Sequence, residues 1–164
     1  MKALPLVLSL GCLLVVTAGR SCADGKKDDV PSLIKDLKSK SPKVRISAAE
    51  DLGHIGAIRA ADAKDAIPVL YEILKKDKDA TVRKAAAAAL GQMDPDPQEA
   101  VPNFIEALKD KAAPVRIAAA GALAILGEEA KDAIPALQEA QNDKDKGVSR
   151  AARMAIRSIR AKKK

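Results

Sequence analysis

The chain has 164 residues, of which 48% are hydrophobic and 1% are aromatic, and it carries a formal net charge of +7. This length allows one domain with a sizeable core and excludes two ordinary domains. Basic side chains do not alternate with stacking aromatics, which argues against recognition of nucleic acid by base stacking. The apolar fraction consists mainly of Ala, Leu, Ile and Val, a composition that favours closely packed helices.

Residues 1–23 have the layout of a secretory signal peptide. Lys2 is followed by an apolar run from Ala3 to Ala18, which is shorter than the roughly 20 residues that a membrane-spanning helix needs. Cleavage after Ala23 would remove both cysteines, and cleavage after Ala18 is the alternative. We therefore predict export to the periplasm or the extracellular space, with no transmembrane span after the leader is removed.

Cys22 leaves a second interpretation of the leader open. A bacterial lipoprotein carries its lipid on a cysteine that follows a short apolar leader, but the charge of Arg20 fits that pattern poorly and Cys12 lies too early. Ordinary secretion is therefore the primary prediction, and lipid anchoring at Cys22 is the alternative. Residues 24–29 are polar, and we expect them to be disordered up to the first helix.

Residues 30–160 consist of four similar units, each with a first helix (helix A) that begins with a proline and a second helix (helix B) that begins with a valine. Proline suits the first turn of a helix, because the amide hydrogen that it lacks has no acceptor there. The units are expected at about 30–56, 66–93, 100–127 and 133–160, with a loop insertion in the first and a basic tail at 161–164. The prolines are Pro31, Pro68, Pro102 and Pro135, and the valines are Val44, Val82, Val115 and Val148.

The units share a pattern of an aspartate, Val-Arg, Ala-Ala, Leu-Gly and then Ala-Ile-Pro, which is clearest from Asp77 to Gly91. This pattern resembles the HEAT-repeat family, and it is similar in particular to the short bacterial HEAT-like repeats named after phycobilisome lyases. The resemblance covers Val30 to about Ile159. It implies an all-α, right-handed α-α solenoid of four helical-hairpin repeats that serves as a scaffold. A bilin lyase or a related isomerase is an alternative that the family name alone suggests.

Arginine and aspartate recur at fixed places in these units. In HEAT-like families such residues form a ladder between repeats, so the resemblance implies an ion pair across each of the three interfaces. Pairing within one unit, for example of Asp77 with Arg83, is the competing geometry, and scattered surface charges are a third interpretation. The pairs expected between repeats are Arg45 with Asp77, Arg83 with Asp110, and Arg116 with Asp143.

The last helix B differs from the other three. Positions two, five and nine residues after the valine are mostly small or apolar in the first three units, and they are Arg150, Arg153 and Arg157 in the last, extended by Arg160. A terminal repeat has no neighbour on this face, so we interpret the arginines as a soluble cap. Recognition of an anionic partner is the second interpretation, which makes a polyanion-binding module an alternative function. The core side of this helix is expected to carry Val148, Ala152, Ala155, Ile156 and Ile159.

Residues with catalytic or metal-binding chemistry are few. His54 is the one histidine and the expected mature chain has no cysteine, which excludes a zinc site of the usual ligand types. Paired aspartates at 77/79, 94/96 and 143/145 lie between helices, where turn and N-cap roles are expected. We predict no catalytic residue, no cofactor and no metal.

These observations together predict an exported, non-enzymatic and monomeric scaffold that binds a protein partner. Helices B should line one surface of the solenoid, with Glu50, His54 and Lys84 among the residues that face it.

Overall fold

The computed structural model describes residues 29–161. The predicted signal peptide, both cysteines and the last three residues of the basic tail lie outside these described residues. The helices follow in the order α1 (Val30–Asp36), α2 (Pro42–Ile58), α3 (Ala60–Ala63), η1 (Lys64–Ala66), α4 (Ile67–Lys76), α5 (Ala80–Gln92), α6 (Pro97–Ala107), α7 (Ala113–Leu126), η2 (Gly127–Ala133), α8 (Ile134–Ala140) and α9 (Lys146–Arg160).

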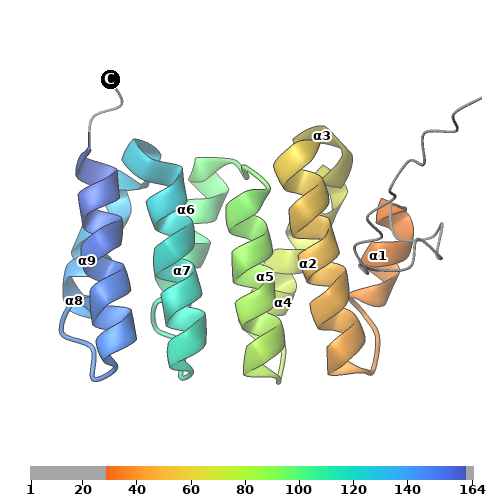
Figure 1. Ribbon diagram of the computed structural model, residues 1–164, viewed down its shortest axis with the longest axis horizontal. Helices are drawn as coiled ribbons and strands as arrows, with labels where there is room; N and C mark the ends of the chain where they lie inside the picture. The colour runs from red at the N-terminus through yellow and green to blue at the C-terminus, as the bar shows by residue number, and fades with distance from the viewer. Residues whose placement is uncertain (1–28, 162–164) are drawn as a thin grey trace, which may run out of the picture.

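The helices form four hairpins that stack side by side in two layers (Figure 1). Helices A are α1, α4, α6 and α8, and helices B are α2, α5, α7 and α9. In this view α5, α7 and α9 lie in front of α4, α6 and α8, while α1 lies beside α2. Residues 29–161 contain no strand. The predicted all-α solenoid of four repeats is therefore confirmed. No helix in this part of the chain is long and apolar enough to cross a membrane.

The core lies between the two layers, and its largest side chains are contributed by both. Core residues with no solvent exposure include Leu52, Leu70, Leu90, Phe104, Leu123 and Leu137. Burial of such side chains is the main favourable contribution to folding, at about 25 cal/mol per Å² of apolar surface. The core side predicted for the last helix B is confirmed, because Val148, Ala152, Ala155, Ile156 and Ile159 are all buried.

Neighbouring helices B pack closely because small residues face one another. A Cβ atom added to Gly53 would lie 2.9 Å from the Cα of Ala89, and one added to Gly91 would lie 3.0 Å from the Cβ of Ala122. Such short separations exclude any larger side chain unless the helices move apart. The alanines and glycines of helices B therefore set the spacing between repeats.

The structure differs from the predicted element boundaries in two places. Helix α6 begins at Pro97 and contains Pro102 within it, because Asp96 caps the helix by accepting the Gln98 amide hydrogen at 2.9 Å. Pro102 is therefore the sixth residue of α6, beyond the first turn, and it has no amide hydrogen to donate to the carbonyl of Gln98. In the first repeat, the predicted loop insertion is helical over much of its length, where the end of α2, α3 and η1 follow one another.

Aspartates cap three helices, as the sequence predicts. Asp79 accepts the Thr81 amide hydrogen at the start of α5, and Asp145 accepts the amide hydrogens of Gly147 and Val148 at the start of α9. With Asp96, they satisfy amide groups that have no acceptor within their own helix.

Arginine and aspartate pair between repeats and not within them. In each pair Nε and Nη2 of the arginine donate to the two carboxylate oxygens of one aspartate, at 2.7 to 2.9 Å. The paired side chains are 5% to 14% exposed. The pairs are Arg45 with Asp77, Arg83 with Asp110, and Arg116 with Asp143.

Each of these arginines also contacts its own repeat. Its Nη1 donates at 2.8 Å to the main-chain carbonyl six residues earlier, in Ser39, Asp77 or Asp110 respectively. The contact within a unit is thus to the carbonyl group of Asp77, while the Asp77 carboxylate is bound by Arg45 of the preceding repeat. One guanidinium therefore joins the loops of two successive repeats through charge-assisted hydrogen bonds.

Hydrogen bonds from the arginines change the ionisation of two ladder aspartates. The Arg83 guanidinium lowers the pKa of Asp110, and the Arg116 guanidinium lowers the pKa of Asp143. In both cases an amide hydrogen two residues further on adds to this effect, because hydrogen bonding to a carboxylate favours its charged form.

Removing one ladder carboxylate should destabilise the fold. Asp110→Asn leaves the largely buried Arg83 guanidinium without its counter-charge, so we expect the free energy of unfolding to fall by about 2–3 kcal/mol. Urea denaturation measures this change. Asp132→Asn, at an exposed carboxylate, is the matched control and should change the free energy of unfolding by no more than about 0.5 kcal/mol. Equal midpoints for the two variants would contradict a structural role of the ladder.

The ladder also predicts how stability depends on pH. Asp110 and Asp143 have lowered pKa values in the folded state, so on acidification the unfolded chain binds protons before the folded chain does. Their contribution is therefore complete above the unfolded pKa of about 4 and is lost as pH falls through the lower folded pKa. The double variant Asp110→Asn/Asp143→Asn should show a flatter decline in unfolding free energy from about pH 5 downward. An unchanged slope would show that other carboxylates control acid unfolding.

Candidate functional site

The four arginines of α9 lie on the outer edge of the last repeat. Arg150, Arg153, Arg157 and Arg160 are all exposed. The residues equivalent to Arg153 in the other repeats are Ala49, Ala87 and Ala120, each with no exposure. In those repeats the same side of helix B, with Gly53 and Gly91, packs against the next helix B. The arginines thus occupy the place where a fifth repeat would stack.

Ser149 replaces the ladder arginine in this last repeat. Its hydroxyl donates to the main-chain carbonyl of Gln141 at 2.7 Å, and Nη2 of Arg153 donates to the same hydroxyl oxygen at 2.8 Å. Arg153 is therefore held against its own helix, while hydrogen bonds to other described residues are not seen for Arg150, Arg157 and Arg160.

The outward face of helices B changes in character from repeat to repeat. We define the B-helix surface as the positions two, six and ten residues after each valine. Glu50 and His54 of α2 and Lys84 of α5 lie exposed on it, as the sequence predicts. The complete set is Ile46, Glu50 and His54; Lys84, Ala88 and Gln92; Ile117, Gly121 and Ile125; and Arg150, Met154 and Ser158.

An exposed apolar strip crosses this surface, and sequence reasoning missed it. Ile117 is 37% exposed, Ile125 is 66% exposed and Met154 is 63% exposed. Nothing lies within 4 Å of the place where a Cβ on Gly121 would stand, so open space separates the two isoleucines of α7. We define the apolar strip as Ala88, Ile117, Gly121, Ile125 and Met154, from three successive helices B.

Within residues 29–161, His54 and the acidic pairs do not come together as a metal-binding group. His54 is exposed on α2. Within residues 29–161, no three His, Cys, Asp or Glu side chains come together in a way that could hold a metal ion. The carboxylates of Asp77 and Asp143 bind ladder arginines, and those of Asp79, Asp96 and Asp145 cap helices.

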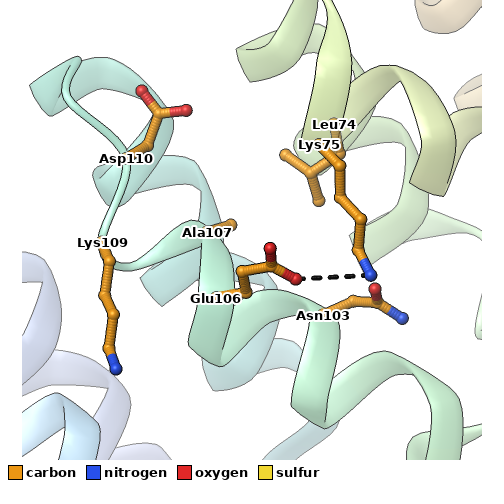
Figure 2. A pocket seen from close by; sticks show the side chains of 7 residues that line it. All are labelled: Leu74, Lys75, Asn103, Glu106, Ala107, Lys109 and Asp110. Atoms are coloured by element: carbon orange, nitrogen blue, oxygen red, sulfur yellow. Dashed lines mark ion pairs between the residues drawn. The ribbon is translucent and has the colours of Figure 1, made fainter.

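A shallow pocket lies between helices A of the second and third repeats (Figure 2). Its volume is about 260 Å³. Lys75 of α4 reaches across it, and its Nζ lies 3.3 Å from Oε2 of Glu106 on α6. This ion pair joins two of the charged groups that line the pocket. The residues that line it are Leu74, Lys75, Asn103, Glu106, Ala107, Lys109 and Asp110.

A second, more open depression of about 620 Å³ lies between the first two loops that join helix A to helix B. We call it the loop groove. Its charged groups include three lysines and two aspartates, together with the first arginine of the ladder. The residues that line it are Lys40, Pro42, Arg45, Lys76, Asp77, Lys78 and Asp79.

Comparison with solved structures supports the architecture. The chain is 26% identical to an engineered protein of known crystal structure, with a TM-score of 0.66 over 80% of this chain and 62% of that one. It therefore spans less than two thirds of the engineered protein's length. It also resembles the complex of CpcE and CpcF of phycocyanin lyase from Nostoc sp. PCC7120, at 22% identity and a TM-score of 0.54 over 93% of this chain and 70% of that one. The second likeness concerns the fold alone.

No protein of curated function matches the sequence. The family model for HEAT repeats matches residues 30–99 and 67–157. These matches together extend over most of the chain and over all four hairpins, so the protein belongs to the HEAT-repeat family.

Proposed function

We propose that the protein is an exported, non-enzymatic scaffold that binds a protein partner on the apolar strip of its B-helix surface. The observation that carries this proposal is the exposure of Ile117, Ile125 and Met154 on adjacent helices. Large apolar side chains that are exposed on one face of a protein and rimmed by polar ones are typical of protein-binding surfaces. A helical-repeat scaffold provides a rigid support for such a surface, which lowers the entropic cost of binding.

The rim of the strip favours an acidic partner segment. Lys84 lies on the α5 side, and Arg150 lies on the α9 side. A segment with one or two apolar anchors and flanking carboxylates would fill the space at Gly121 and bring its charges towards these cations. In this proposal the remaining role of the α9 arginines is to keep the last repeat soluble and to end the stack.

Bilin chemistry has less support from the described residues. Tyr71 is 5% exposed and Phe104 has no exposure, so neither aromatic ring forms a wall of a surface pocket. Burial raises the pKa of Tyr71, and the charges of Glu99 and Asp96 raise it further.

A charge placed in the apolar strip should abolish partner binding. Ile125→Asp puts a carboxylate in the centre of the strip, and loss of such an anchor costs about 2 kcal/mol or more, equivalent to roughly 30-fold in affinity. The measurement is affinity capture from the cell envelope of the source organism. Ile58→Asp is the matched control, because Ile58 is 83% exposed on α2 outside the strip. Proteins captured by the parent and the control but lost with Ile125→Asp support the proposal, and equal capture by both variants contradicts it.

Export predicts a defined mature product. We expect the protein recovered from the periplasm or the medium to begin at Asp24, after removal of residues 1–23, and intact mass spectrometry measures this directly. A mass increase on a chain that begins at Cys22 would instead indicate lipid anchoring. A full-length mass in the cytoplasmic fraction would contradict export.

A further inference from the structure

The four loops that join helix A to helix B lie along one edge of the solenoid, at the bottom of Figure 1. We call this edge the loop edge, and we define it as these loops together with the adjoining helix ends, residues 37–43, 75–79, 108–112 and 141–147. They contain ten lysines and five aspartates, and all ten lysines are exposed. The lysines are Lys38, Lys40, Lys43, Lys75, Lys76, Lys78, Lys109, Lys111, Lys144 and Lys146.

Carboxylates on the loop edge are already engaged. Three of its five aspartates each accept two hydrogen bonds from a ladder arginine of the preceding repeat. The other two, Asp79 and Asp145, accept amide hydrogens at the starts of α5 and α9. Hydrogen bonds from the Thr81 amide keep the pKa of Asp79 below its usual range. The aspartates therefore serve the fold and do not pair with the lysines beside them.

Only two of the ten lysines form ion pairs within residues 29–161. Lys75 pairs with Glu106 at 3.3 Å, and Lys76 pairs with Glu72 at 3.2 Å. The other eight have no carboxylate oxygen of the described residues within 4.0 Å. At least one of these eight lies in each of the four loops.

The opposite edge of the solenoid carries the opposite charge. Residues 59–65, 94–99 and 128–132, which connect helix B to the next helix A, contain eight acidic and three basic side chains, all of them exposed. A surface selected for solubility alone needs only interspersed charges of both signs. Segregation of lysines to one edge and carboxylates to the other instead creates a field that attracts anions to the loop edge.

The loop groove shows how lysines of two loops converge. Lys40 of the first loop and Lys76 and Lys78 of the second line it, and the carboxylates on its wall are bound by Arg45 and by the Thr81 amide. An anionic group seated there would face cations from both repeats. Because the loops repeat along the length of the solenoid, further anionic groups on the same chain would meet Lys109, Lys111, Lys144 and Lys146 in turn.

We propose that the loop edge binds a linear polyanion that runs along the solenoid, such as a sulfated polysaccharide or polyphosphate, and that this site is distinct from the α9 arginines. Lysines that recur in four successive segments along one edge match a chain of regularly spaced charges. Tyr71 and Phe104 are both buried, so neither can stack on a nucleobase. The polymer is therefore expected to be recognised through its charges alone. The inference does not depend on the apolar strip, so Ile125→Asp should leave polyanion affinity unchanged.

The test compares two variants that lose the same charge. The loop-edge variant Lys40→Gln/Lys78→Gln/Lys111→Gln/Lys146→Gln removes one lysine from each loop. The control variant Lys84→Gln/Arg150→Gln/Arg157→Gln/Arg160→Gln removes four exposed cations from α5 and α9. The dissociation constants of the parent and both variants are measured by fluorescence anisotropy with labelled heparin and labelled polyphosphate. The NaCl concentration is varied from about 50 to about 200 mM, because the affinity of proteins for polyanions falls steeply over this range. Equal melting temperatures check that both variants fold.

The loop-edge variant should bind at least about 30-fold more weakly, and its slope of log K against log salt should be smaller by roughly 3. The control should change about 3-fold or less. Neighbouring helices lie roughly 8–10 Å apart, so the four loops span roughly 25–30 Å, and heparin fragments should bind more tightly with length up to about that span. Tighter binding of heparin would identify sulfate as the preferred anionic group, and tighter binding of polyphosphate would identify phosphate.

Four results would overturn the proposal: equal losses in the two variants, affinity that does not depend on fragment length, no binding by the parent at 50 mM NaCl, and binding to vesicles of anionic phospholipid without binding to either soluble polymer.

Discussion

Successive repeats are held in register by arginine side chains, each of which donates hydrogen bonds to its own repeat and to the next one. Arg83 donates to the carbonyl group of Asp77 in its own repeat and to the carboxylate of Asp110 in the next. Because its planar fork fixes both directions at once, the two loops cannot slide past each other without breaking charged hydrogen bonds. The close approach of Gly53 to Ala89 and of Gly91 to Ala122 requires this same register. Ladder and helix spacing therefore depend on each other.

Both ends of the ladder stop at a serine. Ser39 stands where later repeats have an aspartate, and Ser149 stands where earlier repeats have an arginine. A further repeat stacked on α9 would find no guanidinium to bind its aspartate, and it would meet Arg150 and Arg157 in place of small residues. These replacements distinguish the two outermost repeats from the two repeats that lie between them.

The ladder could be predicted because the recurring aspartates and arginines resemble those of HEAT-like repeats, which form such ladders. Their spacing alone left pairing within one unit as an alternative. The start of α6 could not be predicted, since Pro102 copies the helix-starting prolines of the other repeats while Asp96 and Pro97 begin the helix a turn earlier. The apolar strip was missed for a related reason. Ile117 and Ile125 share α7 with buried Val115, Ala119 and Leu123, and an almost wholly apolar helix does not indicate which side faces solvent. That assignment requires the position of the neighbouring helices.

The ladder also determines where positive charge remains on the surface. In the sequence, each Lys-Asp-Lys loop looks nearly neutral, because aspartates lie between and beside the lysines. In the structure, the carboxylates of Asp77 and Asp110 each pair with the ladder arginine of the preceding repeat. The carboxylate of Asp79 accepts an amide hydrogen at the start of α5. Along this edge, eight of the ten lysines have no carboxylate oxygen of the described residues within 4.0 Å, while the apolar strip lies on the B-helix surface. Two separate surfaces thus follow from one arrangement of paired side chains, and a polymer on the loop edge would leave the B-helix surface free for a protein.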